Sequence, residues 1–282
     1  MLRDRKVGSL RNRASWVAVL SIALLIVAGP ASAQDLPNLS GNWAMVQFLP
    51  EIADLPFIGQ LSITAVVGVL VRVEQTGSRV TLFDTYCQTE VLSDETILTS
   101  EVPDTVMTSL APAPRTARLE HINGQWRLSQ DWHVEVRGAV LERPLTDPLP
   151  RGPFDRRVVD MDGDGHPGFT VPVAAFGVIS GDTYVVQRLG YAIAAPVVDP
   201  DRIEGAIEWT SEQVVVGGTD VLLLTPFKQW HDPDPERHRF VMHRLDDNAT
   251  CDAVVEILEE ALKGILGEPT PSSEDEPPSM SG

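Results

Sequence analysis

The sequence lacks the short motifs on which the common enzyme classes depend. It contains neither the G-x-S-x-G nor the S-x-x-K signature of serine hydrolases. It also has no phosphate-binding loop and no dinucleotide-binding fingerprint. Glycoside hydrolysis needs two carboxylates at a defined separation, and a chain with 40 acidic residues does not single out such a pair. The sequence therefore favours a protein without catalytic activity and leaves an enzyme as the alternative.

Basic residues are also scarce. The 282 residues include 22 Lys and Arg against 40 Asp and Glu, which gives a formal net charge of −18. An acidic surface repels the nucleic-acid backbone and anionic membranes, and it attracts cations. We therefore expect no nucleic-acid partner.

The first 33 residues have the pattern of a secretory signal peptide. Five basic residues precede the apolar run Trp16–Gly29, and Ala31-Ser32-Ala33 supplies the small residues of a cleavage site. This run is shorter than the roughly 20 residues of a membrane-spanning helix, although an uncleaved peptide would act as an anchor. No cysteine lies near the cleavage site to carry a lipid. We therefore expect a secreted or periplasmic protein that, once cleaved, keeps no transmembrane segment and carries 17 basic and 39 acidic residues.

The chain has two cysteines, Cys87 and Cys251, which lie far apart in the sequence. An even pair in an exported protein usually forms a disulfide. No C-x-x-C arrangement is present to lower a thiol pKa, so a structural disulfide is favoured over a redox role. In the chain-entropy model, closing so long a loop stabilises the fold by about 4–5 kcal/mol.

Most of the chain alternates between apolar and polar residues in the manner of β-strands. Asn123-Gly124 is a strong hairpin signal because both residues tolerate positive φ, and Thr76–Ser78 and Ser180–Asp182 are weaker turns. Short connections between the strands predict an all-β antiparallel meander, as a barrel or a sandwich. The predicted strands are Gly41–Phe48, Leu61–Glu74, Arg79–Glu90, Thr116–Ile122, Trp126–Arg137, Phe169–Val178, Thr183–Ala194, Ile203–Val216 and Arg239–Leu245.

Other segments depart from this alternation. Residues 143–154 and 225–238 are rich in proline and predict irregular surface segments. An apolar stripe at helical spacing predicts one helix near the C-terminus, capped by Asn248 or Thr250 and ended by Gly264 or Gly267. Residues 268–282 combine Pro, Ser and acidic residues, which is typical of disorder. We therefore expect a signal peptide over residues 1–33, one barrel domain with its helix over 34–267, and a disordered acidic tail over 268–282.

The two ends of the sequence resemble the lipocalins and the wider calycin barrels. Gly41-Asn42-Trp43 matches the G-x-W motif of their first strand, and a last strand followed by a helix matches their order. The middle of the chain matches none of the family's other motifs. The resemblance implies a calycin-like barrel whose floor Trp43 closes, stacked on Arg239 or Arg244 of the last strand. It also implies a disulfide from the C-terminal region to an early strand, here Cys251 to Cys87.

The run Asp160–Gly168 is the strongest indication of a ligand. Ca²⁺ takes six to eight oxygen ligands, and three alternating aspartates supply several of them from one short loop. Pro167 and Val171 replace the aliphatic residue and the bidentate Glu of an EF-hand, so a free-standing calcium loop with a structural role is expected. The alternative is an acidic, glycine-rich turn that binds nothing specifically. The predicted ligands are the side chains of Asp160, Asp162 and Asp164 and the backbone carbonyl of His166, completed by Asp147, Asp155 or water.

Histidines and tryptophans are the remaining candidates for a site. On strict alternation His133 and Glu135 share one strand face, either exposed or in a barrel lumen. A two-histidine metal site formed by residues 231–238 is possible on ligand type, but a solvated loop is favoured. The tryptophans are more often packing residues than sugar or lipid contacts. They are Trp126, Trp132, Trp209 and Trp230.

Three functions are compatible with these observations. The first, which we favour because catalytic signatures are absent, is non-catalytic binding of a small apolar ligand in the barrel. The second is a structural or interaction module of the cell envelope whose barrel is filled with side chains. The third is a calcium-supported hydrolase, which needs His133, Glu135, His231 and Asp232 to converge in one cleft. A cavity in the barrel would favour ligand binding over the filled structural module. A convergent polar cluster would favour the hydrolase.

Overall fold

The computed structural model describes residues 35–55, 59–93, 98–100, 102, 104–175, 179–224 and 228–266. The expected signal peptide and the expected acidic tail lie outside these ranges. The chain divides into two units, Met1–Gln34 and Asp35–Gly282, and all described residues belong to the second.

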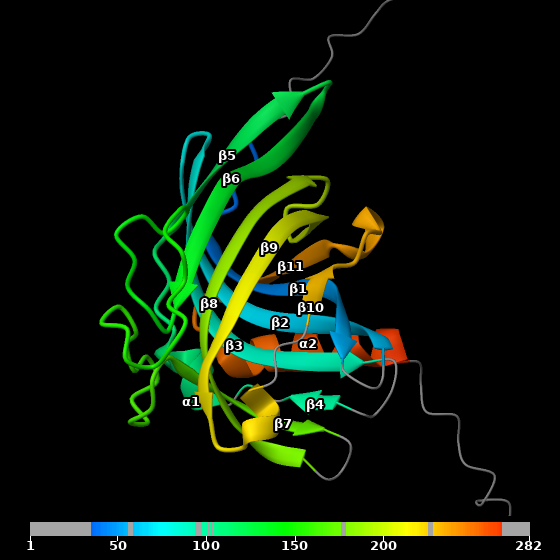
Figure 1. The fold of residues 1–282 in the computed structure, drawn as a ribbon. Coiled ribbons are helices and arrows are strands. Elements are labelled where there is room, and N and C mark those ends of the chain that lie inside the picture. The colour runs from blue at the N-terminus through cyan, green and yellow to red at the C-terminus, as the bar shows by residue number, and fades with distance from the viewer. Residues whose placement is uncertain are drawn as a thin grey trace, which may run out of the picture. The chain divides into compact units, whose positions relative to one another are not determined.

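Eight long strands form an antiparallel sheet that closes into a ring (Figure 1). Each strand pairs with the ring strands next to it in sequence, and pairing of the last strand with the first completes the ring. The fold is therefore an up-and-down meander barrel, which confirms the predicted all-β antiparallel class. The ring strands are β1 (Gly41–Leu55), β2 (Gly59–Thr76), β3 (Arg79–Ser93), β5 (Arg115–Ile122), β6 (Gln125–Arg137), β8 (Ile179–Pro196), β9 (Arg202–Gly218) and β11 (Arg239–Leu245).

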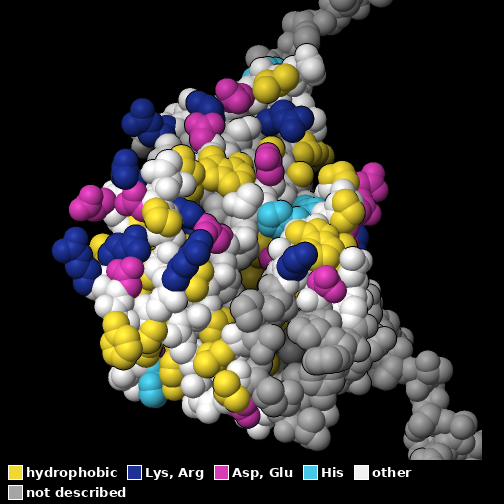
Figure 2. Space-filling view, in the orientation of Figure 1, with side chains coloured by type: hydrophobic (Ala, Val, Ile, Leu, Met, Phe, Trp, Pro, Cys, Tyr) yellow, Lys and Arg dark blue, Asp and Glu magenta, His cyan; other side chains and the backbone are white. Residues whose placement is uncertain are grey.

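Shorter strands pair with the ends of two ring strands. β7 (Phe169–Ala175) pairs with the first part of β8, and β6 pairs with the rest. In the same way β10 (Lys228–His231) and β11 pair with successive parts of β1. Figure 2 shows histidine and hydrophobic side chains gathered where β9, β10 and β11 meet. The remaining elements are β4 (Leu98–Ser100), α1 (Asp104–Ser109), η1 (Val221–Leu224), η2 (Pro235–Arg237) and α2 (Cys251–Leu266).

Two of the predicted turns are present and one is wrong. Asn123 and Gly124 have φ of 52° and 82° and join β5 to β6, as the hairpin signal predicts. Gly77, with φ of 59°, joins β2 to β3. Ser180–Asp182 instead lies inside β8, because β7 supplies ladder partners for all three of these residues. Turn-forming residue types are thus overridden where a neighbouring strand satisfies the backbone.

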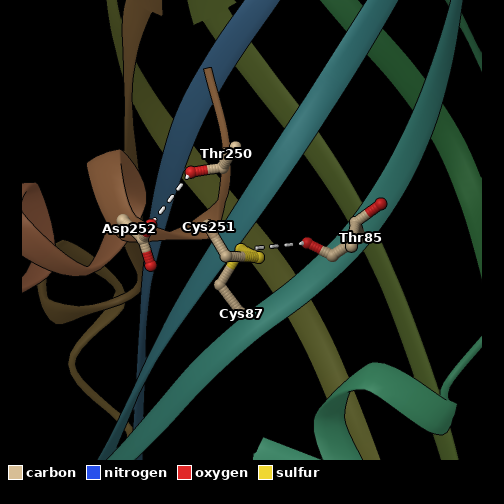
Figure 3. Close-up of a disulfide and its surroundings, with 5 residues drawn as sticks. All are labelled: Thr85, Cys87, Thr250, Cys251 and Asp252. Atoms are coloured by element: carbon tan, nitrogen blue, oxygen red, sulfur yellow. Dashed lines mark hydrogen bonds between the residues drawn. A yellow bond between two sulfur atoms is a disulfide. The ribbon is translucent and has the colours of Figure 1, made fainter. Parts of the chain in front are cut away.

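The predicted C-terminal helix is α2, and it covers the outside of β1, β2 and β3. Its apolar stripe packs closely on β2, where a Cβ added to Gly68 would lie 3.2 Å from Val254. The expected disulfide is confirmed and joins Cys251 at the start of α2 to Cys87 in β3 (Figure 3). The Thr250 hydroxyl contacts the Asp252 carboxylate beside it. None of the helices in the described part of the chain is both long and apolar enough to cross a membrane.

Trp43 closes one end of the ring. Its side chain is fully buried, and the Arg244 guanidinium carbon lies 4.4 Å from its ring centroid. Arg244 also donates to carbonyls of the segment before β1 and, at 2.7 Å, to the Asp201 carboxylate between β8 and β9. The other arginine named by the resemblance, Arg239, lies over Phe48 instead. Arg244 thus ties the N-terminal segment, the last strand and the β8–β9 connection together around one tryptophan.

Candidate functional site

A β-bulge in β6 determines which of its side chains face the interior of the ring. The register with β8 shifts between Gln130 and His133, so both residues face inward although strict alternation would place them on opposite faces. Trp132 is turned outward and is 40% exposed. Its indole lies against β8 at Gly190, where an added Cβ would come within 2.7 Å of the ring.

The bulge completes a group of eight inward-facing side chains from β3, β5, β6 and β8, here called the interior polar cluster. Arg115 is its centre and is 1% exposed. It donates to both carboxylate oxygens of Asp84, at 2.6 and 2.7 Å, and to the side-chain oxygen of Gln130. Burial opposes its charge, but Tyr191 and Asp84 outweigh burial and raise the pKa of Arg115. The cluster consists of Asp84, Tyr86, Arg115, Gln130, His133, Glu135, Arg137 and Tyr191.

Glu135 is the second acceptor of the cluster. Its carboxylate accepts from the hydroxyl of Tyr86 at 2.9 Å, from that of Tyr191 at 3.1 Å and from Arg137 at 3.1 Å. Burial, assisted by the charge of Glu135, raises the pKa of Tyr86 above its ordinary value. Both phenols therefore remain donors, and the carboxylate is held by groups that do not give up their protons near neutral pH.

The charges of the cluster balance. Arg115 and Arg137 face two carboxylates, and burial lowers the pKa of His133 despite the nearby Glu135. His133 is therefore neutral, with its Nε2 at 3.7 Å from a Glu135 oxygen. His133 Nε2 and Arg137 Nε are buried and have no hydrogen-bond partner among the described residues. Two polar atoms beside Glu135 are thus left without a partner from the described residues.

Exposure separates the interior into two halves. The side chains around Trp43 are buried almost completely, whereas the inward-facing side chains of His133 and Arg137 keep 17% and 15% exposure. Gln187 and Ser211, which hydrogen-bond to each other at 3.2 Å, continue this partly exposed wall. The interior is therefore filled at the Trp43 end, whereas some polar side chains beyond it keep partial exposure. The filled half includes Val71, Leu82, Leu128, Ile193, Ile203 and Met242.

A second group faces the interior from β1, β9 and β10. Glu51 continues the inward-facing row of β1 and is 9% exposed. In the ladder it lies opposite His231, whose ring meets that of Trp209 edge-on at a centroid distance of 4.5 Å. No hydrogen bond or ion pair reaches the Glu51 carboxylate from the described residues, and burial raises its pKa to about 7. This group is called the Glu51 site below.

The neighbouring His238 and Asp232 have structural roles. His238 Nδ1 accepts from the indole N–H of Trp209 at 2.7 Å, so its Nε2 donates to the Asp232 carbonyl at 2.7 Å. The Asp232 carboxylate pairs with Arg237. The predicted solvated loop over 225–238 is therefore wrong for its described part, which contains β10 and η2 and fixes the orientation of Trp209. His231 and Asp232 lie in a different group of contacts from His133 and Glu135.

The Asp160–Gly168 run forms a compact loop. Oxygens of Asp160, Asp162 and Asp164 all lie within 4.8 Å of one another, so the three carboxylates could hold a metal ion. Each also accepts a backbone N–H, which fixes its direction. Burial raises the pKa of Asp162, against the opposing hydrogen bond from Thr170, and its Oδ1 is buried without a partner among the described residues.

The side chains of the other residues named for this loop have partners elsewhere, while the ligand role of the His166 backbone carbonyl stays a prediction. The His166 imidazole stacks on Tyr184 of β8 at 4.3 Å. Asp147 and Asp155 are paired with Arg143 and Arg157, at 3.0 and 2.7 Å. The loop nevertheless lies tightly against the barrel, because a Cβ added to Gly168 would come within 2.3 Å of a β8 carbonyl. The three aspartates are therefore the part of the predicted ligand set that the structure brings together.

Sequence reasoning missed Glu51 and Arg115. The predicted first strand ends at Phe48, whereas β1 continues through Pro50 to Leu55 and includes Glu51. Arg115 opens the inward row Arg115, Ala117, Leu119. In both strands a charged residue therefore occupies a position where the alternation calls for an apolar one, and this is the sequence feature that could have identified it.

The Arg115–Asp84 pair predicts a large loss of stability when one partner is removed. Arg115→Met leaves a buried carboxylate unpaired, which we expect to lower the free energy of unfolding by about 3–5 kcal/mol. Arg115→Met with Asp84→Leu should recover most of this loss, because no uncompensated charge remains. Urea denaturation measures both. The exposed Arg118→Met in the same strand is the control, and equal losses for Arg115→Met and Arg118→Met would contradict the prediction.

Glu51 predicts a dependence of stability on pH. Its pKa is about 7 in the folded protein against 4.5 ordinarily, so its favourable contribution is complete below pH 4.5 and is lost as the pH rises through 7. Relative to Glu51→Gln, the wild type should lose up to about 3 kcal/mol of unfolding free energy across this window. Urea denaturation at pH 4.5 and pH 8 measures the difference, with the exposed Glu208→Gln as control. A difference that is the same at both pH values would show that Glu51 titrates normally.

No protein-family model and no curated protein sequence matches this chain. The closed antiparallel ring with one C-terminal helix is compatible with a barrel fold of the kind that the G-x-W motif implies. Membership of the lipocalin family rests on that resemblance alone. The geometry of the chain itself must therefore carry the functional argument.

Proposed function

We propose that this chain is an exported binding protein whose barrel holds a small, largely apolar molecule without converting it. The observation that carries the proposal is the contrast in exposure along the interior. Side chains around Trp43 fill one half, whereas His133 and Arg137 face inward and keep solvent access. An interior that is filled at its floor and accessible above it is the usual form of a barrel that takes one small ligand.

The accessible half offers both apolar and polar surface. Leu49, Val67, Leu189 and Trp209 are inward-facing apolar residues of the main core. Burial of apolar ligand surface against them would contribute about 25 cal/mol per Å², and the polar cluster beneath would orient a polar end of the ligand. An amphipathic molecule therefore fits better than a purely apolar one.

A hydrolase is the second candidate, because His133 Nε2 lies 3.7 Å from Glu135 Oε1. Two features favour binding over catalysis. Glu135 accepts hydrogen bonds from three fixed donors, and the charges around it are balanced. The other two residues of the catalytic hypothesis, His231 and Asp232, belong to a separate group of contacts.

Native mass spectrometry of the exported protein, purified without detergent, tests the proposal. We expect a non-covalent adduct whose small molecule is recovered unchanged after extraction. Saturable one-to-one binding of the neutral probe N-phenyl-1-naphthylamine should accompany it. A bare polypeptide mass with no saturable probe binding would favour the filled structural module. Recovery of a hydrolysed ligand would favour the enzyme.

We also propose that the Asp160, Asp162 and Asp164 loop binds Ca²⁺ in a structural role. Alternating carboxylates, positive-φ glycines at 163 and 165, and the unpartnered Asp162 oxygen support a hard cation with oxygen ligands. Such an ion would fix the connection between β6 and β7. Export and the Cys87–Cys251 disulfide agree with a compartment in which calcium is abundant.

Chelation predicts a loss of stability that depends on this loop. Ca²⁺ at a hundred times its Kd should stabilise the fold by about 2.7 kcal/mol, so EDTA should lower the Tm of the wild type but not that of Asp162→Asn. Native mass spectrometry should show a calcium-sized excess in the wild type that EDTA removes. The exposed Asp247→Asn serves as the control. A wild-type Tm that EDTA leaves unchanged would overturn the proposal, and an equal response to Mg²⁺ would overturn the choice of calcium.

A further inference from the structure

Glu51 is a buried carboxylate that no other described residue matches. It faces the interior from β1, between Ile63 of β2 and His231 of β10. The surface next to it is apolar, since Ala53, Leu61 and Ile63 form a buried cluster there. Burying a charge without a partner is costly, so buried carboxylates are normally paired. A carboxylate kept in this place points to a partner from outside the chain.

No cation of the surrounding elements pairs with Glu51 among the described residues, and Lys228 of β10 lies on the strand face opposite to that of His231. Arg237, which follows β10, pairs with Asp232, and the two arginines of the polar cluster pair with their own carboxylates. His231 stays neutral, because burial and then His238 lower its pKa. The described residues facing Glu51 therefore provide aromatic and apolar surface and no positive charge.

Trp209 supplies a fixed aromatic surface next to this carboxylate. Its indole N–H is held by His238, and its ring meets His231, which lies opposite Glu51 in the ladder. Tryptophan is the best aromatic partner for a cation. Glu51 on β1 and the oriented indole on β9 both lie next to His231 of β10, and a carboxylate with an aromatic face is the usual pair of contacts for an ammonium group.

We propose that Glu51, Trp209 and His231 form an amine-recognition site, and that the ligand of the barrel is a small apolar or aromatic molecule with one protonated amino group. This inference rests on the proposed binding function and names its ligand class. The ammonium group donates to the Glu51 carboxylate and lies against Trp209, while the apolar body contacts the inward face of β1 and β2. A carboxylate or phosphate on the ligand is disfavoured, because Glu51 and the net charge of −18 both repel it.

Three probes of equal chain length test the inference, namely octylamine, 1-octanol and octanoic acid. Their affinities are measured at pH 8 by displacement of N-phenyl-1-naphthylamine from the full-length exported protein. We expect octylamine to bind about tenfold or more tightly than 1-octanol, as a desolvated charge-assisted hydrogen bond implies, and octanoic acid to bind most weakly. In Glu51→Gln the amine and the alcohol should bind within about twofold of each other, with the alcohol affinity unchanged.

Two further variants control the experiment. Glu208→Gln removes an exposed acid from the outer face of β9 and should keep the full amine preference. Trp209→Phe retains an apolar ring but weakens the cation contact, so it should reduce amine binding more than alcohol binding. Near-UV circular dichroism verifies that each variant is folded.

The possible failures are distinguishable. Equal binding of amine and alcohol by the wild type, or an amine preference that survives Glu51→Gln, would overturn the amine site and leave ligand binding intact. A preference for the acid would do the same. Failure of the wild type to bind the neutral probe at all would contradict the proposed function itself.

Discussion

Closure of the sheet places every second side chain of eight strands in one enclosed space, and a charge that faces this space must find its partner there. The interior polar cluster meets this requirement. Arg115 and Asp84 come from adjacent strands, and Glu135 gathers two tyrosines and Arg137 around it. The balance of charge follows from the topology, because these side chains face the interior and are buried or only partly exposed. Glu51 has no such partner among the described residues, and this exception supports the amine site proposed above.

The stability needed to keep such an exception comes from other parts of the molecule. Trp43 and Arg244 close one end of the ring, and the apolar half above them is packed without access for water. On the outside, α2 and the Cys87–Cys251 disulfide bind three strands together. The strands therefore keep their positions without help from the accessible half of the interior. Groups in that half, Glu51 among them, can therefore lack a partner without loss of the fold.

The fold was more predictable than the site because strands and hairpins are encoded locally. Alternation located all eight ring strands, Asn123-Gly124 located a hairpin, and the apolar stripe located α2. The site depends instead on register between distant strands. The β6 bulge puts His133 on the same face as Gln130, and β10 brings His231 opposite Glu51. Neither of these cross-strand relations produces a pattern within a single segment of the sequence. Prolines at 50, 233 and 235 are also untypical of strands, although they lie in or near the end of β1 and β10.

The aspartate loop and the partly exposed half of the interior are both next to β8, the strand that changes its ladder partner from β7 to β6. β6 leaves β8 at Gln187, and β7 takes its place beside the first part of β8. The chain between β6 and β7 contains the loop, which stacks His166 on Tyr184 and presses Gly168 against β8. A cation held by Asp160, Asp162 and Asp164 would therefore hold this connection against β8. This is the strand that pairs with β7 along its first part and with β6 along the rest. If both proposals hold, such a cation would act on the barrel interior through the geometry of β8, without lying in it.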